Sequence, residues 1–325
     1  MIINISNVVK LPGRIPGRRV RLHAAAPMPE LPEVEAQRML LSKHIVGLRI
    51  GALVASEQGG GPRNGEFDDK VFSEGVSCEQ VSNALQGRWI RSACRKGKQL
   101  WLELSDEGVG GKTSACLLLH FGMTGACVIQ GVEAPSYKSF SINLSEWPPR
   151  FTKLELSLVN ALGEVQNTLA YTDPRRFGRI LLRGADPSTL APLSQLAADP
   201  LTDPPTAAEF SAKLQKWSAP IKAVLLDQSK VVCGVGNWVA DETLYQAGVL
   251  PAAVCRELSE AQRLAVHEAM LRVCREACSH NADSSRFPQA RALAFRLSFL
   301  LAFSWLSLHF LLAFAQLSLS CLPPP

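Results

Sequence analysis

The amino-acid sequence predicts an α+β fold, in which a leading helix and an antiparallel β-sandwich or barrel precede a helical region. Three observations support this prediction. Apolar residues recur at helical spacing over residues 30–48. Short apolar runs separated by Gly, Pro and Asp then follow, as in an all-β unit. From Ala207 onward the apolar pattern becomes helical again.

The leading helix and the strands are placed by local patterns. Val34, Leu41, Ile45 and Leu48 fall on one helical face, and Gly47 comes where the helix is expected to end. The predicted strands are the short apolar runs at residues 100–104, 115–121, 126–129, 154–159 and 180–182.

The helical region follows a segment that is rich in proline. Residues 184–206 contain five prolines and little periodicity, which is typical of a linker. Ser259 and Gln262 predict a capping box at the start of a helix whose apolar face includes Cys274 and Cys278. We therefore expect these cysteines to be core residues, although a nearby histidine also invites a metal interpretation.

The two ends of the chain differ from the rest. Residues 1–27 are basic and lack acids, as in an organelle transit peptide or an untranslated leader. Residues 297–322 carry no formal charge, so they are a transmembrane candidate, with a buried helix or a non-native tail as alternatives. Because nothing upstream resembles a membrane protein, we do not expect membrane association. The predicted segments are a basic extension at 1–27, an N-terminal β-domain at 28–185, a linker at 186–208, a helical domain at 209–290 and a tail at 291–325.

Composition narrows the class of protein. The formal net charge of +5 resides entirely in residues 1–27, and 29 Lys and Arg balance 29 Asp and Glu in the remainder. Net charge therefore gives no support for nucleic-acid binding by the body of the chain, which would need local basic patches. The nine cysteines form no C-x-x-C pair, which is typical of reduced thiols in an intracellular protein.

The dipeptide Pro29-Glu30 is the first candidate for chemistry. If Pro29 began a mature chain, its secondary amine would have a pKa of about 7.7–8.0 and roughly a tenth of it would be unprotonated at pH 7. Such an amine attacks an aldehyde-like carbon to give an iminium, and a neighbouring carboxylate can move the proton. If residues 1–27 stay attached, this nitrogen is an amide. The structural alternative is a turn in which Glu33 and Glu35 complement the helix dipole.

Two turns beside predicted strands hold further candidates. Segment 95–99 (Arg-Lys-Gly-Lys-Gln) enters a predicted strand, where Lys98 would suit phosphate binding or proton transfer; a solvated basic turn is the alternative. Segment 120–125 (His-Phe-Gly-Met-Thr-Gly) predicts a tight turn that presents Met123, or one in which Met123 is packed.

Segment 171–179 is predicted to form a hairpin tip, because it contains Asp-Pro and ends near Gly178. Arg175 and Phe177 could insert a planar cation and an aromatic wedge into a duplex. Enzymes that act on a base must extrude it, and the gap left in the stack must be filled. The alternative is an exposed basic turn with Phe177 folded back.

Lys222 and Asn237 flank a Gly-rich turn between two predicted helices. Such a turn places backbone N–H groups at a helix N-terminus, where phosphate binds well, and Asn237 adds a side-chain donor. The motif Gly-x-Gly-Asn does not complete the G-x-G-x-x-G pattern and follows no strand, so dinucleotide binding is not expected.

Together these motifs resemble the formamidopyrimidine-DNA glycosylases, and among them the plant branch. These are bifunctional base-excision-repair enzymes that remove oxidised purines such as 8-oxoguanine and formamidopyrimidine and then nick the backbone. The resemblance covers about residues 28–288, and the opening at 29–35 (Pro-Glu-Leu-Pro-Glu-Val-Glu) distinguishes the chain from the endonuclease VIII-like sister group. It implies an N-terminal β-sandwich with a leading helix, followed by a helical helix-two-turn-helix domain, with DNA between them.

The resemblance also implies roles for individual residues. Pro29 would be the Schiff-base nucleophile at the sugar C1′ atom, Glu30 its acid/base partner, and Lys98 a phosphate ligand that assists proton transfer. The other five residues are implied DNA contacts, the first three filling the gap left by the extruded base and the last two binding phosphate: Met123, Arg175, Phe177, Lys222 and Asn237.

The implied partner is damaged double-stranded DNA, bound by a monomer without a small-molecule cofactor. Zinc is not expected, because plant members lack the zinc finger of the bacterial proteins. The nucleus is the implied location, or an organelle if residues 1–27 are a transit peptide. The family pattern stops after residue 288, and residues 291–325 are apolar and lack Lys. A protein that binds damaged DNA without catalysis is therefore the alternative.

Overall fold

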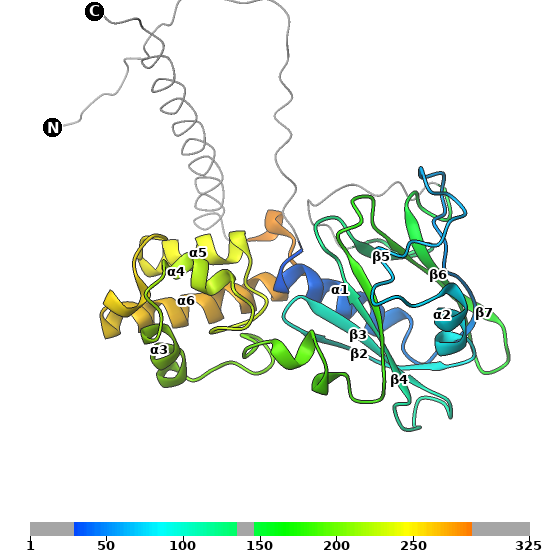
Figure 1. The fold of residues 1–325 in the computed structure, drawn as a ribbon, viewed down its shortest axis with the longest axis horizontal. Helices are drawn as coiled ribbons and strands as arrows, with labels where there is room; N and C mark the ends of the chain where they lie inside the picture. Colours follow the sequence, from blue (N-terminus) through cyan, green and yellow to red (C-terminus); the bar gives the residue numbers. More distant parts are fainter. Residues whose placement is uncertain (1–28, 135–145, 288–325) are drawn as a thin grey trace, which may run out of the picture.

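The computed structural model of the chain describes residues 29–134 and 146–287. A strand-rich part and a helical part lie side by side, with the first helix, α1, between them (Figure 1). The predicted extension at 1–27 and the predicted tail at 291–325, including the apolar stretch 297–322, lie outside the described residues. Within the described ranges no helix is long and apolar enough to cross a membrane.

Helix α1 (Leu31–His44) is shorter than the predicted range of 30–48. Val34, Leu41 and Ile45 lie in the core of the strand-rich part, which confirms the predicted apolar face. Leu31 instead belongs to the core of the helical part. Since both sides of α1 are covered, polar residues such as Glu33 are also buried, and the helix is barely amphipathic.

In residues 29–134 and 146–287, eight antiparallel strands form one continuous sheet in the order β5-β7-β6-β1-β2-β3-β4-β8. The five predicted apolar runs all lie on strands, whereas β1, β2, β7 and the short helix α2 (Cys78–Leu85) carry mixed polar and apolar residues and were not predicted. The strands are β1 (Arg49–Val54), β2 (Trp89–Lys96), β3 (Gln99–Ser105), β4 (Ala115–His120), β5 (Ala126–Ile129), β6 (Thr152–Val159), β7 (Val165–Thr172) and β8 (Arg179–Arg183).

The two ends of the sheet contribute to the same large hydrophobic core. Ile129 of β5 and Ile180 of β8 come from opposite ends of the strand order, yet both belong to the same buried cluster as Leu102 of β3. The two halves of the sheet therefore face each other across this core, which confirms the predicted β-sandwich.

The helical part has its own core. The Ser259 side chain accepts from the Gln262 backbone N–H at 3.2 Å and the Gln262 side chain accepts from the Ser259 N–H at 2.9 Å, which confirms the predicted capping box. Cys274 is fully buried in this core, and Cys278 packs against it, as predicted. The helices are α3 (Ala207–Gln215), α4 (Ile221–Leu226), α5 (Asn237–Ala247) and α6 (Glu260–Ser279), with short 3-10 turns at Pro187–Thr189, Leu193–Gln195, Cys255–Glu257 and Ser284–Arg286.

The predicted linker packs firmly against the helical part. Ala197 donates its N–H to the Gln228 carbonyl at 2.9 Å, and Cys233 donates to the Ala198 carbonyl at 2.9 Å. Asp199 is fully buried. The segment therefore joins the two parts through specific contacts, while the exact boundaries at 186 and 208 stay a prediction.

Candidate active site

Glu30 lies where the strand-rich and helical parts meet. Its carboxylate accepts hydrogen bonds from the backbone N–H groups of Gly236 at 2.8 Å, Trp238 at 3.0 Å and Val239 at 3.1 Å. Pro29, the preceding residue, is buried at the same junction. These donors at the start of α5 were predicted to bind phosphate; a carboxylate 206 residues away in the sequence occupies them instead.

The glycine at position 236 makes this arrangement possible. A Cβ atom there would lie 2.2 Å from the Glu30 Cδ atom and 2.3 Å from Oε1. At Gly234 a Cβ atom would similarly meet the Leu31 side chain at 2.7 Å. The Gly-rich turn thus serves close approach of α1 to α5, which its sequence alone did not reveal.

Burial raises the pKa of two carboxyl groups at this junction. The pKa of Glu30 rises to about 7, against the opposing effects of Lys98 and the three backbone N–H donors. The pKa of Glu33 rises to about 8, because it is buried and because the Glu30 carboxylate is close. Glu33 accepts from the Glu30 N–H at 3.0 Å and from Trp238 Nε1 at 3.1 Å, so it holds both the backbone of Glu30 and the start of α5.

Lys98, at the tip of the β2–β3 hairpin, interacts electrostatically with the same carboxyl groups. Burial lowers its pKa, although Glu30 and Glu33 act in the opposite direction. Gly97 has a left-handed backbone, with φ of +58°, and a Cβ there would lie 3.0 Å from the Cys233 Sγ atom. The hairpin tip therefore sits directly against the helical part, which places Lys98 close enough to Glu30 for an electrostatic interaction.

His120 ends β4 and was not among the predicted site residues. Burial lowers its pKa to about 4, with Lys98 and Arg179 acting in the same direction. It is therefore neutral near pH 7 and adds no charge beside Lys98.

A buried arginine connects the hairpin, α1 and the linker. Arg95 donates to Asp199 at 2.6 and 3.1 Å and to Glu35 at 2.8 Å, and the side chains of Arg95 and Asp199 are fully buried. Asp199 also accepts from the Gly97 N–H at 2.7 Å. For Arg95, the alternative of a solvated basic turn is wrong, because its guanidinium is buried and paired with carboxylates. Glu35 likewise pairs with arginine.

Met123 lies in a turn that rests on the loop carrying Arg175 and Phe177. A Cβ atom at Gly122 would lie 2.4 Å from the Phe177 carbonyl carbon, so the two backbones are in direct contact. Asp173 ties them together, since it accepts from Thr124 Oγ1 at 2.9 Å and from the Arg175 N–H at 3.2 Å. The structure thus brings the three predicted gap-filling residues together.

Two side chains of this loop, Arg175 and Phe177, reach the surface. Arg175 is exposed and Phe177 is 44% exposed, so Phe177 is not folded back. The Arg175 guanidinium lies 5.1 Å from the Phe177 ring centroid. The predicted hairpin is wrong, because β7 pairs with β5 and β6 whereas β8 pairs with β4. The loop instead crosses between the two halves of the folded sheet.

Lys222 and Asn237 lie on α4 and α5. Lys222 forms an ion pair with Asp241 at 2.6 Å, and Asn237 is exposed at the first position of α5. In the part of the chain that the structure describes, no group of three His, Cys, Asp or Glu side chains could hold a metal ion.

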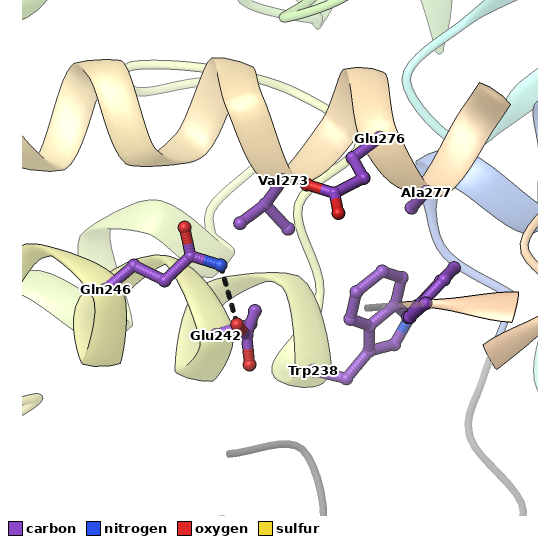
Figure 2. Close-up of a pocket in the computed structure, with 7 residues that line it drawn as sticks. Trp238, Glu242, Gln246, Val273, Glu276 and Ala277 are labelled. Atoms are coloured by element: carbon purple, nitrogen blue, oxygen red, sulfur yellow. Dashed lines mark hydrogen bonds between the residues drawn. The ribbon is translucent and has the colours of Figure 1, made fainter. Parts of the chain in front are cut away.

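A pocket between α5 and α6 is lined in part by Trp238 (Figure 2). Its lining includes Glu242, whose Oε1 accepts from Gln246 Nε2 at 2.6 Å, and Phe287, whose ring centroid is 6.3 Å from that of Trp238. Trp238 therefore connects this pocket with Glu33, but no residue predicted to act in chemistry lines it.

Two family models match the chain. The model of the formamidopyrimidine-DNA glycosylase N-terminal domain matches residues 28–180, and that of the formamidopyrimidine-DNA glycosylase H2TH domain matches residues 196–289. The chain is 37% identical over 262 residues to a formamidopyrimidine-DNA glycosylase of Arabidopsis thaliana, a match that covers 80% of this chain and 61% of that protein. The corresponding protein of Desulfitobacterium hafniense is 31% identical over 260 residues, covering 80% and 81%.

Solved structures have the same fold. The MutM (Fpg) protein of Thermus thermophilus matches with a TM-score of 0.58 and 28% identity over 77% of this chain and 76% of that one. Fpg (MutM) of Lactococcus lactis, solved with DNA that contains Fapy-dG, matches with a TM-score of 0.59 and 26% identity over 77% and 80%. The two matched domains cover most of the chain in the order that the sandwich and the helices show, and the chain therefore belongs to the formamidopyrimidine-DNA glycosylase family.

Proposed function

We propose that the chain is a DNA glycosylase of base-excision repair that removes oxidised purines, such as 8-oxoguanine and formamidopyrimidine, and then cleaves the abasic site as a lyase. The observation that carries this proposal is the buried carboxyl of Glu30, next to Pro29 and close to Lys98, with a pKa of about 7. A group with that pKa can both accept and donate a proton at neutral pH.

In the proposed reaction the free secondary amine of Pro29 attacks the C1′ atom of the damaged nucleotide. The N–C1′ bond forms as the bond to the base breaks, and the base leaves with the bonding electrons and takes up a proton. Glu30 accepts the proton lost by the amine and returns it to the sugar ring oxygen, which opens the ring and leaves an iminium. Loss of a C2′ proton then expels the 3′ phosphate, and a second elimination expels the 5′ phosphate.

Lys98 contributes as a phosphate ligand beside the nucleophile. Its partly buried ammonium faces two carboxyl groups whose protonation changes near neutral pH, so it also stabilises the ionised form of Glu30. Met123, Arg175 and Phe177 would enter the stack where the damaged base has left it. Lys222 and Asn237 would contact phosphate.

Borohydride trapping tests the catalytic proposal. A chain that begins at Pro29 should form a covalent adduct with duplex DNA that contains 8-oxoguanine, because reduction of the iminium makes the bond permanent. The same chain with residues 1–28 attached is the matched control and should form none, since its Pro29 nitrogen is an amide. Absence of an adduct from the chain that begins at Pro29 would refute the proposed chemistry.

A second candidate is a protein that binds damaged DNA without catalysis. It is favoured by the exposure of Arg175, Phe177 and Asn237, because contacts of these side chains with DNA need no free amine at Pro29. Binding would then depend strongly on salt and select weakly among sequences. N-terminal sequencing of the protein from its native source separates the candidates, because catalysis requires Pro29 as the first residue.

We also propose a nuclear monomer that acts on double-stranded DNA, with an organelle as the alternative location. Cell fractionation followed by size-exclusion chromatography with light scattering would test location and oligomeric state separately.

A further inference from the structure

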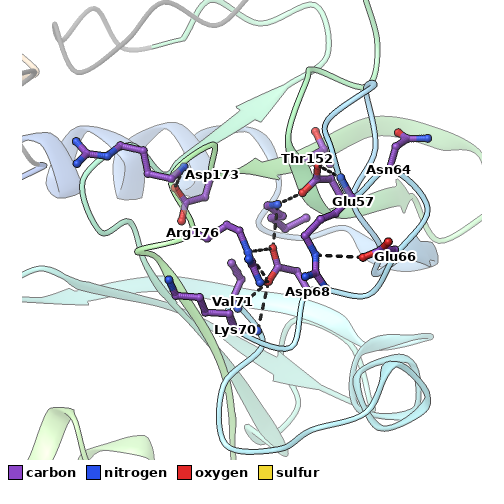
Figure 3. Close-up of polar contacts among 12 residues, drawn as sticks. Glu57, Asn64, Glu66, Asp68, Lys70, Val71, Thr152, Asp173 and Arg176 are labelled. Atoms are coloured by element: carbon purple, nitrogen blue, oxygen red, sulfur yellow. Dashed lines mark hydrogen bonds and ion pairs between the residues drawn. The ribbon is translucent and has the colours of Figure 1, made fainter.

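Four charged side chains meet beneath the loop that carries Arg175 and Phe177 (Figure 3). Glu57, Asp68 and Lys153 are almost completely buried, with side-chain exposures of 1%, 0% and 1%, and Arg176 closes the group from the surface. Lys153 pairs with Glu57 and, at 2.9 Å, with Asp68. The group contains two positive and two negative charges, so its formal net charge is zero. Charges that are removed from water need such paired partners.

The side chain of Arg176 attaches the loop to this charge cluster. Its Nε and Nη2 atoms both donate to Asp68, at distances of 2.8 to 3.1 Å. Its backbone is left-handed, with φ of +57°, a conformation that is unfavourable for a non-glycine residue. The paired side chain stabilises that conformation. Because Arg176 is directed inward, its neighbours Arg175 and Phe177 are exposed.

Asp68 also orders the segment opposite the loop. Its carboxylate accepts from the backbone N–H groups of Lys70 and Val71 at 3.3 Å each. The Lys70 ammonium lies 5.4 Å from the Phe177 ring centroid. Phe177 is therefore in contact with two cations, Lys70 and Arg175, on two segments that Asp68 holds together.

We propose that Asp68, paired with Arg176 and backed by the Lys153–Glu57 pair, is a positioning residue that holds Phe177 ready to enter the DNA stack. This inference rests on the proposed function, because it presumes that the loop fills the gap left by an extruded base. A wedge that is already ordered spares the protein the entropy of ordering it on binding. Asp68 does not itself touch DNA.

The test uses the full chain and does not need a free Pro29 amine. The probe is a duplex with a tetrahydrofuran abasic analogue and 2-aminopurine beside it, whose fluorescence rises when the stack is opened. Asp68→Asn should slow this rise and weaken binding of the duplex by about tenfold, within the range of coupling energies for residues in contact. Asp69→Asn is the matched control, because Asp69 is 82% exposed and lies 3.9 Å from Arg176; it should change neither quantity more than about twofold.

A double variant separates positioning from general damage to the fold. In a Phe177→Ala background the binding loss caused by Asp68→Asn should disappear, whereas a merely structural role would persist there. Arg176→Lys keeps the charge but loses the two-pronged contact, and it should slow insertion even if Asp68→Asn does not fold.

The inference would be overturned if Asp68→Asn and Asp69→Asn had equal effects, or if the binding loss caused by Asp68→Asn persisted in the Phe177→Ala background. It would also be overturned if Arg176→Lys raised the 2-aminopurine fluorescence at the wild-type rate, or if the wild-type chain gave no fluorescence rise. A wild-type chain that opens the stack, but is not trapped by borohydride when it begins at Pro29, would overturn only the proposed catalysis.

Discussion

Replacing Gly236 with alanine would test whether the contact between Glu30 and α5 supports catalysis. The backbone of Gly236 has φ of −123°, which alanine adopts freely, so the added methyl group acts only through space. That methyl would lie 2.2 Å from Glu30 Cδ, more than 1 Å inside the 3.4 Å at which ordinary contact begins. A displacement of about 1 Å would lengthen the hydrogen bonds from Gly236, Trp238 and Val239 beyond useful range.

The expected loss of rate follows from this displacement. A misplacement of about 1 Å can cost roughly 100-fold in rate, and removing a positioned acid/base group costs about 100- to 10,000-fold. We expect single-turnover trapping by the chain that begins at Pro29 to slow by about 100-fold or more. Gly184→Ala is the matched control, because among the described residues no heavy atom beyond its chain neighbours lies within 4 Å of the added methyl. If Gly236→Ala were trapped at the wild-type rate, the proposed role of this contact would be refuted.

Three further predictions concern stability, pH and salt. Asp199→Asn should lower the free energy of unfolding by about 3–5 kcal/mol in urea titrations, because it leaves the buried guanidinium of Arg95 without a full counter-charge. Asp203→Asn, at a nearby exposed position, should change the free energy of unfolding little. A loss below about 1 kcal/mol for Asp199→Asn would contradict this reasoning. The pKa of Glu30 is raised to about 7 in the folded chain and is about 4.3 when unfolded. The contribution of Glu30 to the free energy of unfolding is therefore present at low pH and is lost as pH rises through that window. Glu30→Gln should gain stability relative to wild type between pH 4 and pH 7, and a constant difference between the two proteins would argue against a raised pKa. Lys222→Met should reduce the slope of log DNA affinity against log salt concentration by about 1. Lys43→Met, at an exposed position, is the control and should leave the slope unchanged. Equal slopes for the wild type and both variants would exclude a phosphate contact at Lys222.

Local patterns in the sequence determined much of the fold. The apolar face of α1, the five apolar strands and the cap at Ser259 depend on residues within a few positions of one another, and all are confirmed. The same patterns missed β2 and β7. In β2 the arginine at position 95 points into a buried ion pair, so polarity no longer reports exposure.

Sequence also determined which residues are candidates for chemistry, because motifs such as Pro29-Glu30 and the loop at Arg175 are contiguous. Only the tertiary structure decided how they meet. Glu30 caps a helix 206 residues away, and Asp68 holds Arg176 across 108 residues. Contacts between distant polar residues follow from the path of the chain and leave no period in the sequence. The physical state of the proposed site, above all the raised pKa of Glu30, is therefore a property of the assembled junction.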